Sequence, residues 1–409
     1  MFIKTRITTF CSAFLLAAMS MASAPAYAVN ETMANLLSIL RDKGSITQDE
    51  YNALMNAARA EDEQAKKAAD KQMADISKMQ ESTSWASKVK IKGDMRLRYQ
   101  YQNQDSKISR ERGRLRYRAG IIAKPLDRFE VGAGMASGGS DPRSTNQTFD
   151  SAFSTKGLQL DYAYVKYDMT DNFTAIGGKF GQKGFLWNAT DLMWDGDINP
   201  EGISGAYNFN NDLGKTFLYG GLWVINESSS SGNDPFMGYV ELGHKFSSGD
   251  LFATIAGTYY GFSDLNAGNI GAIAGNGNTD SQFGVIGLSW EVGSNNLLGR
   301  NMTGSLFGDY VNNTDTSTNQ DTGYSFGGKL TNGTWTLKYI YANLDANAVP
   351  DFLPDSDRFD GDTNIRGHEL IAEYNIFKHV TLGLDYYNTH TKGTSVTQNI
   401  LQADVVVKF

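Results

Sequence analysis

The sequence predicts an all-β protein, a transmembrane antiparallel β-barrel of about 16 strands that follows a short N-terminal helical extension. Three observations predict this fold class. Polar and apolar residues alternate along stretches that are longer than the strands of most soluble proteins. Short and long connections take turns between these stretches. The composition favours strands and turns, because 43 Gly, 22 Phe and 20 Tyr stand against only 7 Pro.

The final stretch, residues 399–409, shows the alternation clearly. Every second residue is apolar, namely Leu401, Ala403, Val405, Val407 and Phe409. Polar residues fill most positions between them, and Val406 is the exception. A period of two puts the two sets on opposite faces of a strand, so one face can meet hydrocarbon while the other meets water. A soluble sandwich could also end in such a strand, and the rest of the chain has to decide between the two.

Residues 1–28 have the features of a secretory signal peptide. Lys4 and Arg6 form a charged start, an apolar run follows, and Ala26 to Ala28 is a small-x-small cleavage site. We therefore expect the mature chain to begin at Val29. The single cysteine, Cys11, lies in this segment, so we expect no disulfide, thiol nucleophile or thiolate metal site in the mature protein.

Residues 29–85 differ from the rest and predict a helical extension on the periplasmic side. A first helix is predicted by the apolar residues Leu36, Leu37, Ile39 and Leu40. It ends at Gly44, and the capping box from Thr47 to Glu50 begins a second helix. Further on, Met73, Ile76 and Met79 are spaced by three. A short coiled coil that aids self-association and a solvated helical stalk both fit, and we expect the coiled coil.

The barrel domain is predicted over residues 86–409. Residues 88–101 alternate without a break for 14 residues. A strand that crosses a bilayer at a tilt needs about 9–11 residues, whereas a soluble strand has about 5–6. Sixteen stretches qualify: 88–101, 110–123, 128–138, 156–169, 172–181, 202–210, 214–226, 235–246, 250–262, 281–292, 300–312, 322–331, 334–344, 366–376, 379–390 and 397–409.

The connections between these stretches indicate which side of the membrane each one faces. Short links lie at 124–127, 170–171, 246–249, 331–333 and 377–378. Long ones lie at 139–155, 182–201, 263–280, 313–321 and 345–365. Short periplasmic turns and longer outer loops are typical of membrane barrels. A soluble barrel or propeller is the alternative, but no self-similar period of about 40–50 residues supports propeller blades.

Composition excludes other classes. No run of 18 or more apolar residues follows the signal peptide, so helical membrane spans are excluded. The formal charge of −8 gives no support for nucleic-acid binding. A mean hydropathy of −0.38 does not argue against a membrane, because only alternate residues of a barrel strand face lipid.

Basic residues predict a charged wall inside the barrel. The alternation of the first two strands puts one row of arginines on the face opposite Leu97 and Tyr117: Arg96, Arg98, Arg112, Arg114, Arg116 and Arg118. A lipid-facing arginine at mid-depth would cost about 2–4 kcal/mol, so these side chains are expected to face the lumen. They could merely pair with wall carboxylates. We favour a role in guiding ions, because few acids, such as Asp94 and Glu111, are interleaved.

The long connection at 182–201 is too apolar for a loop in water, since it contains Phe185, Leu186, Trp187, Leu192, Met193 and Trp194. Folding it back into the lumen would bury these side chains against the wall. Its acids would then lie near the barrel axis: Asp191, Asp195, Asp197 and Glu201. Acids opposite a basic wall would create a transverse field that favours small polar or charged solutes. An extracellular lid or a trimer-contact loop is the alternative.

Several short motifs carry a resemblance to a known family. Lys43-Gly44 with Glu50-Tyr51, the 88–98 stretch and the segment from Trp194 to Gly202 resemble the putative-porin family of Gram-negative outer membranes. The resemblance implies a passive channel and a homotrimer, in contact with outer-membrane lipid and lipopolysaccharide, without catalysis, cofactor or metal. The loop after the fifth strand forms the constriction in porins of sixteen strands. The aromatic end at Phe409 resembles the terminal strand of outer-membrane barrels, which the β-barrel assembly machinery recognises.

A second resemblance is more limited. Gly178-Lys179-Phe180-Gly181 is similar to the strand that leads into the constriction loop of phosphate-selective porins, and we therefore add Lys179 to the basic wall. Phosphate selectivity does not follow, because no lysine-rich ladder extends beyond the first strand. The arginine wall favours anions, whereas the loop acids and the overall acidity favour cations. We expect a weak anion preference.

Other site signals are weak. Residues 355–362 lack the spacing of an EF-hand and are expected to form a solvated outer loop. His244, His368, His379 and His390 are isolated, and no GxSxG or Walker motif is present. Two alternatives to a channel remain: a structural barrel that anchors the envelope through residues 29–85, and a barrel lipid hydrolase that would pair His390 with Ser395.

Overall fold

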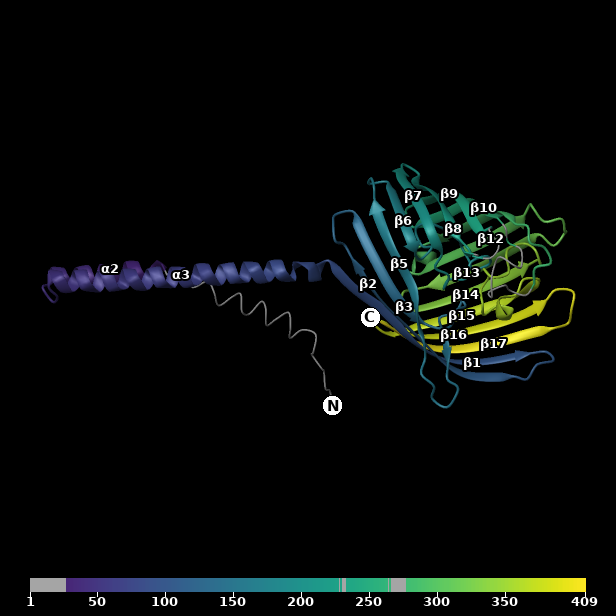
Figure 1. Cartoon of the computed structure of the whole chain (residues 1–409), viewed down its shortest axis with the longest axis horizontal. Coiled ribbons are helices and arrows are strands. Elements are labelled where there is room, and N and C mark those ends of the chain that lie inside the picture. Colours follow the sequence, from purple (N-terminus) through teal and green to yellow (C-terminus); the bar gives the residue numbers. More distant parts are fainter. Residues whose placement is uncertain (1–26, 228, 230–232, 264, 266–276) are drawn as a thin grey trace. The chain divides into compact units, whose positions relative to one another are not determined.

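A computed structural model of the chain describes residues 27–227, 229, 233–263, 265 and 277–409. The chain divides into two units, Met1–Ser87 and Lys88–Phe409 (Figure 1). Most of the predicted signal peptide, with Cys11, lies outside the described residues. The boundary between the units falls within two residues of the predicted start of the barrel domain.

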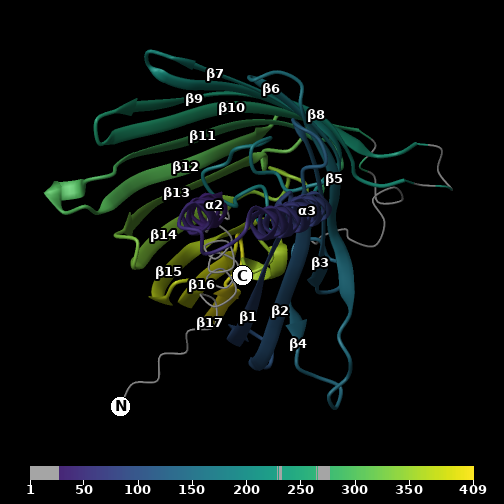
Figure 2. The same cartoon turned by 90° about the vertical axis from the view of Figure 1, so that its left-hand side faces the viewer.

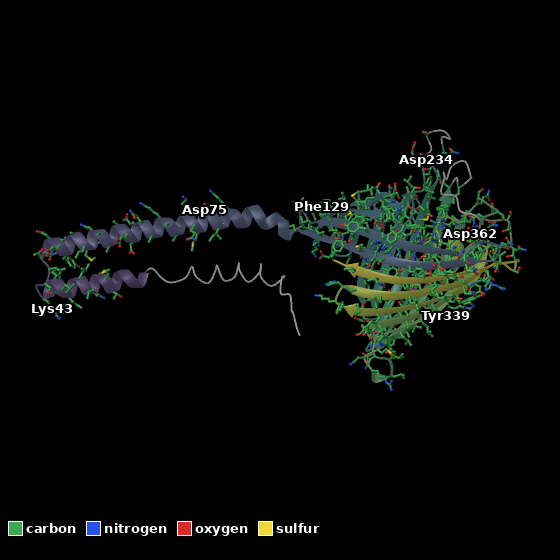
Figure 3. All side chains as sticks on the ribbon, turned by 90° about the horizontal axis from the view of Figure 1, so that it is seen from below. Lys43, Asp75, Phe129, Asp234, Tyr339 and Asp362 are labelled. Atoms are coloured by element: carbon green, nitrogen blue, oxygen red, sulfur yellow. The ribbon has the colours of Figure 1, made fainter. Side chains whose placement is uncertain are left out.

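From Tyr27 onward, the first unit consists of two helices in contact with each other, α2 (Tyr27–Asp42) and α3 (Gln48–Ser87). Lys43 lies at the turn between the two helices (Figure 3). Gly44, the next residue, takes a φ of +69°, a conformation that glycine adopts without strain. The predicted capping box forms: the Thr47 backbone N–H donates to the Glu50 carboxylate at 2.7 Å, and the Glu50 N–H donates to Thr47 Oγ1 at 3.2 Å. Met73 and Ile76 are exposed on α3. Self-association of this helix through a coiled coil stays a prediction. Neither helix in the described part of the chain combines the length and the apolar character that a bilayer span requires.

The second unit is a closed antiparallel barrel of sixteen long strands, which confirms the predicted fold class. A two-residue strand, β4 (Gln147–Thr148), adds to β2. The long strands are β1 (Val89–Gln104), β2 (Arg110–Ala123), β3 (Phe129–Ser137), β5 (Leu158–Asp168), β6 (Phe173–Lys179), β7 (Glu201–Asn211), β8 (Gly214–Val224), β9 (Phe236–Ser248), β10 (Leu251–Ser263), β11 (Gly284–Ser294), β12 (Thr303–Asn313), β13 (Thr322–Thr331), β14 (Trp335–Leu344), β15 (Ile365–Phe377), β16 (Val380–Thr391) and β17 (Thr397–Lys408).

The first and last strands close the barrel. In the β1–β17 register Leu97 is opposite Val405 and Arg98 is opposite Asp404. The Phe409 N–H donates to the Gly93 carbonyl at 3.0 Å, and the Gly93 N–H donates to the Phe409 carbonyl at 2.9 Å. A Cβ at Gly93 would overlap with the Arg118 carbonyl oxygen of β2 and lie 2.7 Å from the Phe409 ring, so only glycine fits at this point of the seam. Each of the sixteen long strands thus pairs with a neighbour on both sides, and closure removes the two free ends of the sheet.

Side chains alternate between two environments along each strand, as the period of two predicts. On β9, Val240 and Leu242 are 51% and 60% exposed, whereas Tyr239 and Glu241 are buried. The outward rows are mostly apolar, and the inward rows carry most of the buried polar side chains. This arrangement suits a barrel whose outside meets lipid and whose inside is polar.

Strand boundaries agree with the sequence prediction to within about three residues, the usual uncertainty of strand ends. The limits of β2 and β13 agree in full. β6 ends at Lys179, two residues early, because Gly178 takes a φ of +119° and the chain turns inward after it. β4 was not predicted, since two residues carry no detectable period.

Candidate functional site

The two strands that were predicted to form a basic wall lie side by side in the barrel. In the β1–β2 register Arg96 is opposite Arg116, and Arg98 is opposite Arg114. Arg112 and Arg118 follow on the same face of β2. Their neighbours Leu97 and Tyr117 are exposed on the outward face. The six arginines therefore share the face that lines the inside of the barrel.

Four of these arginines form ion pairs with carboxylates. Arg116 and Arg118 both bind Asp94, at 2.7 and 2.8 Å. Arg98 donates to Asp404 of the last strand at 2.7 Å, and Arg96 lies 3.6 Å from the same carboxylate. The alternative in which the wall arginines pair with carboxylates therefore holds for these four arginines. Asp94 was noted from the sequence, but Asp404 was not connected with the arginines, because it lies 306 residues after Arg98.

Arg112 and Arg114 differ from the other four. Arg112 donates to the Gln102 side chain at 2.8 Å, and Arg114 donates to the Gln100 side chain at 2.9 Å. Both partners are neutral amides. Among the residues that the structure describes, neither guanidinium forms an ion pair within 4 Å, so their positive charges act on the lumen without a direct counter-charge.

The connection between β6 and β7, residues 180–200, folds back against the inward face of the barrel (Figure 2). The Trp187 N–H donates to Glu241 of β9 at 3.0 Å. The N–H groups of Ala189 and Thr190 donate to Asp309 of β12 at 3.1 and 2.6 Å. Glu241 and Asp309 belong to inward rows, so this loop, called the 180–200 loop below, lies inside the barrel. It crosses the faces of strands β8 to β13.

Aromatic packing holds the 180–200 loop in place. Trp194 lies 5.4 Å from the Trp223 ring of β8 in an edge-to-face arrangement and 6.0 Å from the Tyr260 ring of β10. Phe180 and Phe185 pack edge to face at 5.8 Å. All these side chains are buried. Such pairs add about 0.5–1.5 kcal/mol each to the apolar burial, which offsets part of the entropy lost when the loop is ordered.

The four acids predicted for this loop have different surroundings. Asp197 lies 3.2 Å from Arg118, and it is the only one of the four paired with the arginine wall within the described residues. Asp191 pairs with Arg358 at 2.9 Å. Asp195 is buried and accepts the N–H groups of Asp197 and Ser356. Glu201 is the first residue of β7 rather than a loop residue.

Lys179 lies away from the arginine wall. Its ammonium binds Glu201 at 2.9 Å, and the two residues are opposite each other across β6 and β7. Glu201 is also in register with Val224 of β8, which is 51% exposed on the outward face. The register therefore puts Lys179 and Glu201 in an outward row at the strand ends. This position differs from the predicted pore-lining role, because the chain turns inward only after Lys179.

A second loop also folds inward, and it was not predicted. The connection between β14 and β15, called the 345–364 loop below, buries Asn347, Ala348 and Val349 completely. The Leu353 carbonyl accepts the N–H of Asp195 at 2.8 Å, so the two inward loops touch. The solvated outer loop expected at 355–362 is wrong, because Asp355, Arg358 and Phe359 are buried there.

A signal for this second loop was present in the sequence. Residues 346–359 include Ala346, Ala348, Val349, Phe352, Leu353 and Phe359. The 180–200 loop was assigned to the lumen on the same kind of apolar content. Acidic residues interleaved from Asp351 to Asp362 masked the pattern and suggested a solvated loop instead.

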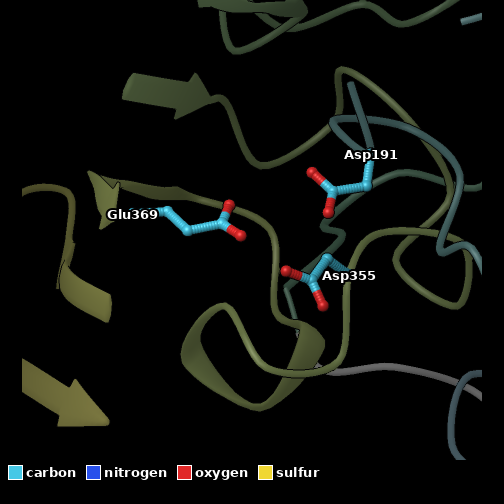
Figure 4. A group of neighbouring side chains, drawn as sticks. All are labelled: Asp191, Asp355 and Glu369. Carbon is cyan, nitrogen blue, oxygen red and sulfur yellow. The ribbon is translucent and has the colours of Figure 1, made fainter. Parts of the chain in front are cut away.

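Arg358 is the centre of a charge cluster whose three carboxylates, of Asp191, Asp355 and Glu369, are shown in Figure 4. Its guanidinium lies 2.5 Å from Glu369 of β15, 2.9 Å from Asp191 and 3.8 Å from Asp355. The three carboxylates come within 4.8 Å of one another, a spacing that could suit a metal ion. The guanidinium pairs with all three here, so the cluster is held together by an internal cation. Removing one partner of a buried ion pair typically costs about 3–5 kcal/mol.

Two loop carboxyls have pKa values that follow from their surroundings. Burial raises the pKa of Asp195 to about 7, and the nearby Asp197 and Asp191 carboxylates add to the rise. Burial is the largest single influence and opposes ionisation of Asp357, but Arg98, at 3.2 Å, and a hydrogen bond with Gln402 combine with the more distant arginines to hold the pKa of Asp357 below its usual value. Arg114 and Arg96 act in the same direction. Asp357 is therefore ionised at neutral pH beside the arginine wall.

Cavities lie on both flanks of the 180–200 loop. One, of about 680 Å³, is lined by residues that include Lys92, Arg118 and Asp197. The other, of about 410 Å³, is lined by residues that include Trp194, Trp223 and Phe352.

The pair proposed for a barrel hydrolase does not come together in a recognisable form. His390 Nδ1 bonds with Thr397 Oγ1 at 2.8 Å, and Nε2 bonds with Asn388 Oδ1 at 3.2 Å. Both ring nitrogens are thus occupied by residues other than Ser395. A nucleophile needs a base within hydrogen-bond reach, and the geometry gives this reading no support.

A closed barrel of sixteen antiparallel strands, apolar outside and polar inside, with an inward loop after the fifth long strand, defines the porin class of fold. The family model described as "Putative porin" matches residues 101–282 of this chain, which confirms the resemblance found in the sequence. Family and fold together support an outer-membrane channel.

Solved structures similar to this chain have low sequence identity to it. A structure of Pseudomonas putida OprB has 14% identity and a TM-score of 0.55, and the similarity covers 80% of this chain and 96% of that one. A triple mutant of the Rhodopseudomonas blastica porin has 12% identity and a TM-score of 0.48, over 78% of this chain and 100% of that one. A search of curated proteins finds no match.

Proposed function

We propose that this protein is a porin of the Gram-negative outer membrane that lets small hydrophilic solutes and ions diffuse passively down their gradients. In this proposal the 182–201 segment narrows the channel and faces the arginine wall of β1 and β2. No bond is made or broken in the solute. The channel acts through size, hydration and charge alone.

The observation that carries the proposal is the contact between the inward loop and the wall. Asp197 of the loop lies 3.2 Å from Arg118, and the uncompensated Arg112 and Arg114 continue the wall on the same strand. Opposite charges across a narrow aqueous gap align water and ions along the field. Polar and charged solutes interact with this field in place of the oriented water that they displace, whereas apolar solutes displace that water without compensation.

The surroundings of the barrel form the second part of the proposal. The apolar outward rows suit contact with outer-membrane lipid and lipopolysaccharide, and three copies would form a homotrimer. The β-barrel assembly machinery would recognise the final strand through Phe409, whose side chain is 54% exposed at the strand end. The signal peptide 1–28 directs export, and residues 29–85 extend into the periplasm.

Planar-bilayer recording with purified protein tests the channel. We expect steady open steps with a conductance that rises with salt concentration. Heat-denatured protein in the same detergent is the control. Absence of steady open channels, in a preparation that is folded by circular dichroism, would rule out the proposal and favour a structural barrel.

A further inference from the structure

We propose that the 345–364 loop is a second constriction element, in which Arg358 positions the 180–200 loop and Asp357 sets the charge of the arginine wall. The inference rests on the proposed channel function, since it concerns what solutes meet inside the lumen. It assigns positioning and selectivity to two neighbouring residues of a loop that the sequence placed in solvent.

The 345–364 loop is fixed inside the barrel by contacts along its length. Arg143, from the connection between β3 and β4, donates to the carbonyls of Asp351 and Gly361 at 3.1 and 3.2 Å. The Asn313 side chain of β12 donates to the Asn347 carbonyl at 2.8 Å. The Ser356 hydroxyl donates to the Arg143 carbonyl at 3.0 Å. These contacts hold the 345–364 loop at its start, middle and end. The loop therefore narrows the lumen at all times instead of moving in and out of it.

Arg358 links three parts of the barrel through one guanidinium group. Asp191 belongs to the 180–200 loop, Glu369 belongs to the wall strand β15, and Asp355 belongs to the same loop as Arg358. Without the cation, three carboxylates within 4.8 Å of one another would repel. The middle of the 180–200 loop would then lose its tie to β15. Its ties to Glu241 and Asp309 would remain, so the loop would shift locally while the barrel stays folded.

Asp357 acts on the wall itself. Its carboxylate lies 3.2 Å from Arg98, which also binds Asp404. Asp360 of the same loop accepts from Gln102 at 3.0 Å and from Gln398 at 3.1 Å, and these bonds hold the loop against β1 and β17. One negative charge from the loop thus reaches the middle of the arginine row and lowers its positive potential. Asp357 opposes the anion preference that the arginines alone would produce.

The test of Asp357 is the reversal potential across a salt gradient for Asp357→Asn. Loss of one charge close to the ion path should raise the anion-to-cation permeability ratio by roughly two- to fourfold at low salt, with a smaller change at high salt. Asp171→Asn is the matched control, because Asp171 pairs with Arg128 on an exposed turn. A ratio that equals the control, or a shift towards cations, would overturn the selectivity part of the inference.

The test of Arg358 uses single-channel recording of Arg358→Gln and Arg358→Lys. We expect larger open-channel current fluctuations for the glutamine variant, and recovery of steady current for the lysine variant, which keeps the charge. Arg128→Gln controls for loss of an arginine from an exposed pair. If Arg358→Gln does not assemble, Asp191→Ala decides, since it removes the acceptor that ties Arg358 to the 180–200 loop and leaves Asp355 and Glu369 in place. Steady wild-type-like current in the decisive variant would overturn the positioning role.

These outcomes separate the two proposals. If the wild-type protein does not conduct, the channel function itself fails. If it conducts and the variants behave as the controls do, the channel stands and only the role of the 345–364 loop fails.

Discussion

The surroundings of Arg114 show that, in the described part of the chain, part of the arginine wall has no carboxylate partner at short range. Arg114 lies between Arg112 and Arg116 on the inward face of β2, but its only side-chain bond within the described residues is to neutral Gln100. Arg116, two positions further on, binds Asp94 instead. Two arginines of the same row thus differ in whether a carboxylate compensates them. The difference arises because β1 offers the neutral Gln100 to Arg114 and the carboxylate of Asp94 to Arg116.

We predict that Arg114→Ala shifts the reversal potential in a salt gradient towards cations. One uncompensated positive charge is lost near the ion path, so the anion-to-cation ratio should fall by roughly two- to fourfold at low salt. Arg128→Ala, on the exposed turn before β3, should leave the ratio unchanged. Equal ratios for both variants would show that the wall does not govern ion passage.

Glu241 is a buried anchor of the 180–200 loop. It accepts the Trp187 N–H at 3.0 Å and the Thr258 hydroxyl at 2.9 Å. We predict that Glu241→Leu lowers the free energy of unfolding by about 1–3 kcal/mol, because two buried donors lose their acceptor. Glu241→Gln keeps an acceptor oxygen and should lose less. Urea unfolding in detergent measures both, and a larger loss for glutamine would contradict the assignment.

The raised pKa of Asp195 predicts that the ion selectivity of the channel depends on pH. The pKa of Asp195 is raised to about 7, first by burial and then by the Asp197 and Asp191 carboxylates, so this carboxyl gains a proton as pH falls through 7. One negative charge then leaves the loop, and the reversal potential should shift towards anions between pH 8 and pH 6. The Asp195→Asn variant should lack this step. The same step in the variant would assign it to another group.

Asp195 also affects stability in the opposite direction to most carboxylates. Because its pKa is raised in the folded state, the native protein binds the extra proton between about pH 4 and pH 7. The contribution of this group to stability is thus fully present below its unfolded pKa. It is lost as pH rises through 7.

At the scale of elements, two loops and one helical pair depart from a plain barrel. The 180–200 loop and the 345–364 loop both pack against the inward face of the barrel instead of extending into solvent. Each loop packs there through apolar side chains and a few buried charges. The helices α2 and α3 form a separate unit. The strands supply a rigid frame, while the inward loops decide what can pass through it.

Deletion of residues 29–85, with the signal peptide retained, tests the division between the two units. We predict that single-channel conductance survives, because no residue of the wall or of the inward loops lies in this segment. Size-exclusion chromatography in detergent reports whether self-association is lost, as a coiled coil would require. Loss of conductance in a correctly assembled variant would support the structural reading of the barrel.

At the scale of the whole molecule, the outward rows of the sixteen long strands expose many large apolar side chains. The free-energy cost of placing a charge on this outward surface depends on its depth in the bilayer, because a charge at the middle costs more than one near the interface. Leu242 lies at the centre of β9, and Leu213 lies on the short turn after β7. Both side chains are exposed, at 60% and 67%.

We predict that Leu242→Arg costs about 2–4 kcal/mol and Leu213→Arg about 0–1 kcal/mol. The first change puts a charge into hydrocarbon, whereas the second leaves it near the headgroups. Unfolding of each variant from lipid bilayers measures the difference. Equal costs would mean that the outward belt of β9 does not face lipid.

The sequence by itself determined the number of strands, their faces and the inward course of the 180–200 loop. These features depend on local periodicity and apolar content, which are readable within some ten to twenty residues. The strand period alone put the six arginines on one face, and the structure keeps them there.

Only the tertiary structure decided how those charges are compensated. Asp404 reaches Arg98 because the last strand closes on the first, and Asp357 reaches the same arginine from a loop that enters the lumen. Asp191 and Glu369 meet Arg358 for a similar reason. Pairings between residues far apart in the chain depend on barrel closure and register, and no local pattern in the sequence encodes which charge will meet which.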